Sequence, residues 1–139
     1  MSDHLSNRVK NIPPSGIRSF FDLVLNSNDI ISLGVGEPDF LTPWAIRDEA
    51  IYRIEKGFTS YTSNKGLLEL RTAISEYLTR QFSIDYSADQ LLITNGVSEA
   101  VDIVFRSFIN DGDEVILPQP TYVCYQPLIE LSGGVVKSF

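Results

Sequence analysis

The sequence predicts an α/β fold built on a parallel β-sheet, and two observations carry that prediction. First, short apolar runs alternate with helix-like segments between Leu91 and Phe139, which is typical of right-handed βαβ units. Second, the runs at 91–93 and 115–117, within the expected strands 91–94 and 114–117, are entirely apolar. Strands of a parallel sheet are covered on both faces, so they carry continuous apolar runs rather than alternating ones.

The start of the chain predicts little regular structure. Residues 1–11 are polar, and we expect them to be loosely held with the only histidine, His4, in solvent. After two prolines, apolar residues recur at helical spacing between Ile17 and Leu25, which predicts a short amphipathic helix.

Two longer helices are expected in the middle of the chain. Thr42 and Pro43 are typical of an N-cap and a first helical residue, and the helix should run to about Lys56, before Gly57. A second helix should follow Gly66 and end near residue 82. The apolar face of this second helix consists of Leu67, Leu70, Ile74 and Leu78.

From residue 91 onward, strands and helices should alternate. The expected elements are a buried strand at 91–94, a helix at 99–110, a strand at 114–117, a helix at 122–131 and a strand from 135. The helix at 99–110 should direct inward Val101, Val104, Phe105 and Phe108. Pro127 must lie near the first turn of its helix, because proline removes a hydrogen bond from a helix interior.

Bulk composition narrows the classes of function. The 139 residues fit one domain or the start of a larger one, and the formal charge of −7 disfavours a general nucleic-acid binder. The single cysteine, Cys124, allows no intrachain disulfide and fits a reducing compartment. We find no secretory signal and no membrane-spanning run, so we expect a cytoplasmic protein.

Four motifs follow one another along the chain. They are Gly-x-Gly-Glu-Pro-Asp-Phe-x-Thr-Pro at 34–43, Tyr-x-x-x-x-Gly-x-x-x-Leu-Arg at 61–71, Ile-Thr-Asn-Gly-Val-Ser-Glu-Ala at 93–100, and Gly-Asp-Glu-Val-Ile-Leu-Pro-Gln-Pro-Thr-Tyr at 112–122. In this order they resemble the class I/II aminotransferases, which are pyridoxal-phosphate enzymes of fold type I. Because the four motifs follow one another in this order between residues 34 and 122, their joint occurrence is far more specific than any one of them.

The resemblance implies a particular architecture. It implies the start of the fold type I large domain, a parallel sheet with helices on both faces, preceded by a segment of the small domain. We therefore expect an N-terminal arm and small-domain segment at 1–42 and the first part of the cofactor-binding large domain at 43–139. Since the chain stops inside an expected strand, we expect it to be truncated, or recorded as a fragment.

Residues 94–99 are the strongest candidate for an anion site. A strand that ends in a glycine turn and a helix start presents free N–H groups and the positive end of the helix dipole. An ordinary Asn-Gly turn with a serine cap is equally compatible with the residues alone. By resemblance, Gly96, Val97 and Ser98 hold the phosphate of pyridoxal 5'-phosphate, although many relatives have a small residue where this chain has Val97.

Two tyrosines are the next candidates for cofactor binding. Tyr122 follows a predicted strand and should lie at the carboxyl edge of the sheet, where open α/β sheets bind ligands. By resemblance it stacks on the cofactor ring, whereas Tyr125 is expected to pack in the core. By resemblance Tyr61 reaches across a homodimer interface to the phosphate bound by the neighbouring subunit. Without the resemblance, either could be an ordinary packing or surface tyrosine.

The resemblance also implies substrate contacts. Gly36 matches the glycine whose backbone faces the substrate α-carboxylate, and Ile17 matches a residue that lines the substrate entrance. The substrates implied are an amino acid and a 2-oxo acid. We expect no catalytic residue in this chain, because the Schiff-base lysine, the partner of the pyridine nitrogen and the substrate arginines should lie beyond it. Its own lysines are Lys10, Lys56, Lys65 and Lys137.

Several alternatives stay open at this stage. Another fold type I reaction, such as that of a carbon–sulfur lyase, would share these motifs, and so would a non-catalytic truncated interaction module. A dinucleotide site is disfavoured, because the turn at 95–98 has one glycine rather than Gly-x-Gly-x-x-Gly. Asp111, Asp113 and Glu114 fit a solvated turn better than a metal site, since no histidine accompanies them.

Overall fold

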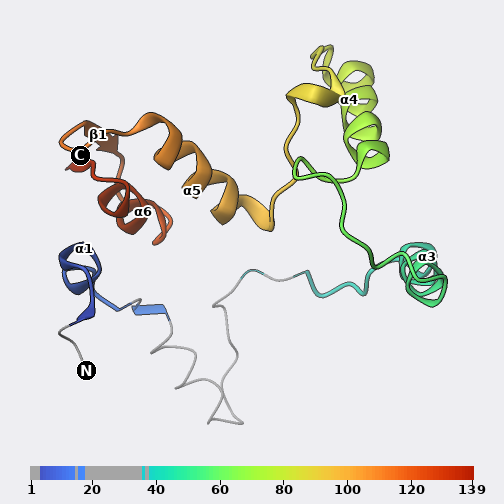
Figure 1. Ribbon diagram of the computed structural model, residues 1–139, viewed down its shortest axis with the longest axis horizontal. Helices are drawn as coiled ribbons and strands as arrows, with labels where there is room; N and C mark the ends of the chain where they lie inside the picture. Colours follow the sequence, from blue (N-terminus) through green and yellow to red (C-terminus); the bar gives the residue numbers. More distant parts are fainter. Residues whose placement is uncertain (1–3, 15, 18–35, 37) are drawn as a thin grey trace, which may run out of the picture. The chain divides into compact units, whose positions relative to one another are not determined.

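A computed structural model describes residues 4–14, 16–17, 36 and 38–139, and its contacts divide the chain into two compact units (Figure 1). The first unit combines the described residues of the N-terminal segment 1–30 with Thr94–Phe139. The second consists of the described residues between 31 and 93. The predicted domain boundary after residue 42 stays a prediction. Within the described ranges, none of the helices is long and apolar enough to cross a membrane. The predicted helix between residues 17 and 25 lies almost entirely outside the described residues.

A β–α–β segment forms the centre of the first unit. Strand β1 (Glu114–Leu117) and strand β2 (Val135–Ser138) pair in parallel, with Glu114 opposite Val135. Helix α6 (Tyr125–Leu131) connects them, and Pro127 is its third residue. The side chain of Ile129 is completely buried beneath this pair of strands and α5. Both predicted strands, the parallel pairing and the connecting helix are confirmed.

Helix α5 (Gly96–Phe108) begins three residues earlier than predicted. Its half-buried side includes Val101 and Phe105, as expected. Phe108 is 78% exposed, so its predicted inward orientation is wrong. It is the last residue of the helix, and the α5 residues that line the groove toward β1 and α6 are Ala100, Val101, Val104 and Phe105.

The predicted strand at 91–94 does not form. This segment is extended at its start, but β1 and β2 are the strands of the one sheet in the part of the chain that the structure describes. An apolar run becomes a strand only when a neighbouring strand accepts its backbone hydrogen bonds. Here the Ile93 N–H donates instead to the Lys65 carbonyl oxygen, 3.0 Å away, which ties the segment to a loop.

Residues 6–11 form more regular structure than predicted. Ser6 caps the short helix α1 (Asn7–Lys10) by accepting a hydrogen bond from the Val9 N–H. Arg8 then pairs with Asp111 at 2.5 Å and donates to the Leu131 carbonyl oxygen at 3.4 Å. These contacts fix α1 beside α6 in the first unit, whereas His4 is exposed as expected.

The second unit contains helices α3 (Trp44–Glu55) and α4 (Leu68–Phe82) and a 3₁₀ turn, η2 (Ala88–Gln90). Both helices match the prediction within two residues. Pro43, not Thr42, is the N-cap of α3, so no side chain caps this helix. Along α4, the predicted face is covered only at Ile74 and Leu78. The residue buried most deeply in α4 is a charged one, Arg71.

Candidate functional site

The first turn of α5 presents backbone N–H groups without a side-chain cap. The first N–H groups of any α-helix lack an intrahelical acceptor, and the side chain of the N-cap residue Asn95 makes no capping hydrogen bond to the first turn of α5. Val97 is 73% exposed, and Gly96 and Ser98 are exposed as well. The backbone at this turn is therefore accessible to a ligand from solvent.

Gly96 is suited to a close approach by such a ligand. Its φ is +79°, a conformation that side chains disfavour. A Cβ added at Gly96 would meet nothing within 4 Å, so the space in front of this backbone is open. The Thr94 hydroxyl donates to the Gly96 carbonyl oxygen at 2.9 Å and braces the turn from behind.

One negative charge already lies at this helix start. The Glu99 carboxylate accepts a hydrogen bond from the Asn95 N–H, which is a favourable place for an acidic side chain beside the positive end of a helix dipole. It satisfies the Asn95 N–H and leaves those of Val97 and Ser98 to other acceptors. The turn thus offers two N–H groups and the Ser98 hydroxyl, a donor set that fits the oxygens of a phosphate group.

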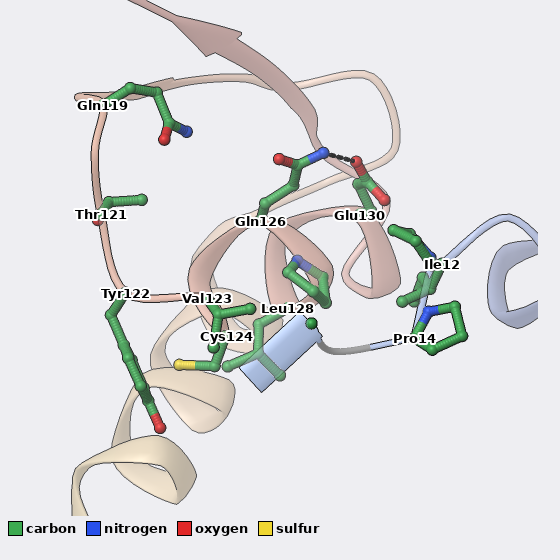
Figure 2. Close-up of a pocket in the computed structure, with 13 residues that line it drawn as sticks. Ile12, Pro14, Gln119, Thr121, Tyr122, Val123, Cys124, Gln126, Leu128 and Glu130 are labelled. Carbon is green, nitrogen blue, oxygen red and sulfur yellow. Dashed lines mark hydrogen bonds between the residues drawn. The ribbon is translucent and has the colours of Figure 1, made fainter. Parts of the chain in front are cut away.

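Tyr122 lies at the edge of a hollow on the first unit (Figure 2). The hollow has a volume of about 680 Å³, and its wall consists of Ile12, Pro13, Pro14, Gly16, Gln119, Thr121, Tyr122, Val123, Cys124, Gln126, Pro127, Leu128 and Glu130. The Tyr122 ring is 55% exposed and meets Tyr125 edge to face, with centroids 5.7 Å apart. A perpendicular contact of this kind covers at most one face of a ring, so at least one face of Tyr122 is left by Tyr125 for stacking on a planar ligand.

Tyr125 has the packing role expected from the sequence. It lines a smaller apolar groove between α5, β1 and α6, together with Val101, Phe105, Leu117 and Ile129. By contacting Tyr122 from this covered position, it holds the more exposed ring in place. The hydrogen bond between Gln126 and Glu130, 2.9 Å long, lies on the polar side of the hollow (Figure 2).

The other predicted site residues are all exposed and lie in different places. Ile17 belongs to a helical turn in the first unit. Gly36 and Tyr61 belong to the second unit, and a Cβ added at Gly36 would meet nothing within 4 Å. Tyr61 is fully exposed. In the first unit the structure brings together Gly96, Val97 and Ser98 on one helix turn; the roles of all these residues stay predictions.

The acidic turn at 111–114 is a solvated structural turn, as its sequence predicts. The Asp113 carboxylate accepts hydrogen bonds from the Asn110 N–H at 2.7 Å and from the Asn110 side chain at 3.1 Å. These bonds favour the ionised form and lower the pKa of Asp113. Asp111 is engaged by Arg8. Across the described ranges, no group of three or more metal-binding side chains comes together.

Sequence reasoning missed one residue of functional interest. Arg71 was noted only as the end of a motif, yet its side chain is buried and bonds two backbone carbonyl oxygens. Its position among apolar helix residues, four places after Leu67 and three before Ile74, is the signal that could have indicated a buried arginine.

Comparison with known proteins gives consistent results. The family described as "Aminotransferase class I and II" matches residues 28–139. YugH of Bacillus subtilis (strain 168), a protein named as an aminotransferase, is 50% identical over 136 residues. The match covers 97% of this chain and 35% of that protein. An aromatic-amino-acid aminotransferase of Thermococcus litoralis is 41% identical over 131 residues, covering 94% of this chain and 34% of its own length.

Solved structures agree with these relatives. An aspartate aminotransferase from Thermotoga maritima matches with a TM-score of 0.86 and 36% identity, covering 96% of this chain and 37% of its own. The chain thus spans about a third of the length of the relatives it matches.

Proposed function

Because this chain belongs to the class I and II aminotransferase family, we propose that the whole protein transfers an amino group between an amino acid and a 2-oxo acid. The cofactor we propose is pyridoxal 5'-phosphate. When bound, it supplies the electron sink for chemistry at the substrate α-carbon. The residues of this chain supply binding and orientation.

The observation that carries the proposal is the uncapped first turn of α5. The N–H groups of Val97 and Ser98 and the Ser98 hydroxyl would hold the cofactor phosphate, and the absence of a Cβ on Gly96 lets the phosphate approach. The helix dipole adds to the attraction. Glu99 opposes part of it, so a further positive or neutral donor from elsewhere in the site is expected.

Tyr122 and Tyr61 would complete the cofactor contacts. The ring of Tyr122, which meets Tyr125 in a perpendicular contact, would stack on the pyridine ring. The exposed hydroxyl of Tyr61 would donate to a phosphate oxygen in the neighbouring subunit of a homodimer. Gly36 and Ile17 would contribute to the substrate carboxylate site and to its entrance, and a cytoplasmic location likewise stays a prediction.

The direct test is cofactor binding and amino transfer by the purified whole protein. We expect it to acquire the visible absorption of bound pyridoxal phosphate and to convert an amino acid and a 2-oxo acid into the exchanged pair. A protein that stays colourless after incubation with the cofactor would contradict the proposal. A coloured protein that instead cleaves a carbon–sulfur bond would place it in another reaction class.

A further inference from the structure

Arg71 is a buried cation for which no role has been given. It is 5% exposed and is the one buried polar or charged residue in the ranges that the structure describes. A guanidinium group carries five N–H donors and stays charged at every relevant pH, so burying it requires acceptors. The identity of those acceptors shows what the residue does.

The acceptors of Arg71 come from two separate loops. Its Nε donates to the Gly66 carbonyl oxygen at 3.3 Å, and one terminal nitrogen donates to the Ala88 carbonyl oxygen at 2.5 Å. The Asp89 carboxylate lies 3.7 Å from the same nitrogen but is itself almost fully exposed. Arg71 therefore joins the end of one loop, at Gly66, to the turn η2.

The loop that ends at Gly66 is held at several other points. The Gly66 N–H donates to the Ser63 carbonyl oxygen at 2.8 Å, and the Ile93 N–H donates to that of Lys65 at 3.0 Å. The Lys65 ammonium group donates to the Asp89 carbonyl oxygen at 2.9 Å. Tyr61, two residues before Ser63, projects fully into solvent from this anchored turn.

In this arrangement the exposed side chain, Tyr61, and the residue that anchors its loop, Arg71, lie at different places in the sequence. Tyr61 makes no covering contact of its own, so its position depends on where the turn at 63–66 is held. Arg71 is the buried side chain of that anchor, because the other side chains that bond to the turn or its neighbours, those of Ser63 and Lys65, are exposed. Exposed hydrogen bonds contribute less to fixing a loop than buried charge-assisted ones.

We propose that Arg71 is a positioning residue, which holds the turn at 63–66 so that Tyr61 is presented to the cofactor phosphate. The role of Tyr61 rests on the proposed function, whereas the anchoring role of Arg71 does not. The guanidinium group does not itself touch the cofactor in this proposal. Two readouts on the whole protein separate the two parts.

The first readout is cleavage by trypsin, which needs no cofactor. Lys65–Gly66 lies inside the anchored turn, and Lys56–Gly57 at the end of α3 is an internal reference. Arg71→Gln should raise the cleavage rate at Lys65 relative to Lys56 by about tenfold, because cleavage follows the population of the opened loop. The matched control is Arg80→Gln, an exposed arginine of the same helix, which should leave the ratio unchanged.

An unchanged ratio in Arg71→Gln, or the same rise in Arg80→Gln, would overturn the anchoring role. If Arg71→Gln does not fold, Arg71→Lys replaces it with the same two outcomes. Lysine keeps the charge but cannot reach both carbonyl oxygens with a planar fork.

The second readout is a double-mutant cycle on cofactor affinity. Arg71→Gln should weaken pyridoxal-phosphate binding by about tenfold when Tyr61 is present and by less than about threefold in the Tyr61→Phe background. A merely structural role would lower the affinity equally in both backgrounds and would overturn the link to Tyr61. An unmodified protein that binds no pyridoxal phosphate would contradict the proposed function and, with it, this link, while selective trypsin cleavage would still establish the anchor.

Discussion

The two compact units are centred on buried residues of opposite chemistry. In the first unit, Ile129 is completely buried between apolar side chains of α5 and β1. Among the described residues of the second unit, Arg71 is the buried one, and its guanidinium group donates to two backbone carbonyl oxygens. The first centre depends on the volume that fills it, whereas the second depends on the number and direction of donors.

This difference indicates how each unit serves the proposed site. An apolar centre stabilises a strand–helix–strand segment without fixing individual loops, because hydrophobic contacts are not directional. A buried guanidinium fixes particular carbonyl groups and so defines the course of a loop. The first unit carries Gly96, Val97 and Ser98, the proposed phosphate-binding residues, on a regular helix. The second carries Tyr61 on a loop that, in our proposal, Arg71 anchors.

The largest effect is expected from removing side-chain volume at Ile129. Ile129→Ala should lower the free energy of unfolding by about 2–5 kcal/mol, through lost burial and the cavity left behind. Ile129→Val should cost about 0.5–1.5 kcal/mol, because it removes a single methylene group. Urea unfolding of the whole protein measures both. Equal losses for the two variants would show that the volume at this position does not govern stability.

A slightly smaller effect is expected from filling the close contact at Gly66. An added Cβ would lie 2.6 Å from the Ile93 Cβ, and φ is +93°. Gly66→Ala should therefore cost about 2–4 kcal/mol, from the strained backbone and from overpacking. Gly57→Ala is the control, since its φ of +77° is similar but its Cβ would meet nothing within 4 Å. It should cost only the backbone strain, about 1–2 kcal/mol.

The polar centre should respond to loss of donors rather than loss of volume. Arg71→Met keeps most of the side-chain length but leaves the Gly66 and Ala88 carbonyl oxygens without their donor. We expect a loss of about 1–3 kcal/mol in the free energy of unfolding. A neutral or stabilising result would mean that the two carbonyl groups find other partners, and the contrast between the two units would then fail.

The smallest effect concerns the acidic turn. Because hydrogen bonds lower the pKa of Asp113 below its ordinary value of 3.8, the ionised form is stabilised in the folded state. Its contribution is fully present above pH 3.8 and is lost as the pH falls through the lower folded pKa. The stability difference between the unmodified protein and Asp113→Asn should therefore shrink with acid. The control is Asp85→Asn, which replaces an exposed aspartate of the second unit. If the stability difference for Asp113→Asn did not change with pH, the lowered pKa assigned to Asp113 would be contradicted.

Sequence patterns predicted the elements whose formation depends on neighbours close in the chain. Strand β1, helix α6 and strand β2 follow directly from apolar runs and turn residues, and α4 follows from its periodicity. The strand predicted at 91–94 failed because its backbone partner, Lys65, comes from a loop that no local pattern identifies. The prediction that Phe108 points inward was wrong because a helix face is buried only where another element covers it.

Around the candidate site, too, features with a local sequence signal could be predicted, and features that depend on distant residues could not. The turn at 96–98 could be predicted as a candidate anion site because a glycine at a helix start is a local signal, and its role stays a prediction. The ordered α1 was missed because it depends on the pairing of Arg8 with Asp111, 103 residues away. Arg71 was missed for a related reason, since its acceptors are carbonyl groups, which carry no sequence signal.

We propose that the first turn of α5 binds the phosphate of the cofactor. The most direct test of this proposal compares the affinities of the cofactor-free whole protein for pyridoxal 5'-phosphate and for pyridoxal, which lacks the phosphate. Ser98→Ala removes one hydrogen bond to a charged group, so we expect its preference for the phosphorylated form to fall by about tenfold or more while pyridoxal binding is unchanged. A Ser98→Ala protein that loses affinity for both compounds equally, or for neither, would contradict the claim.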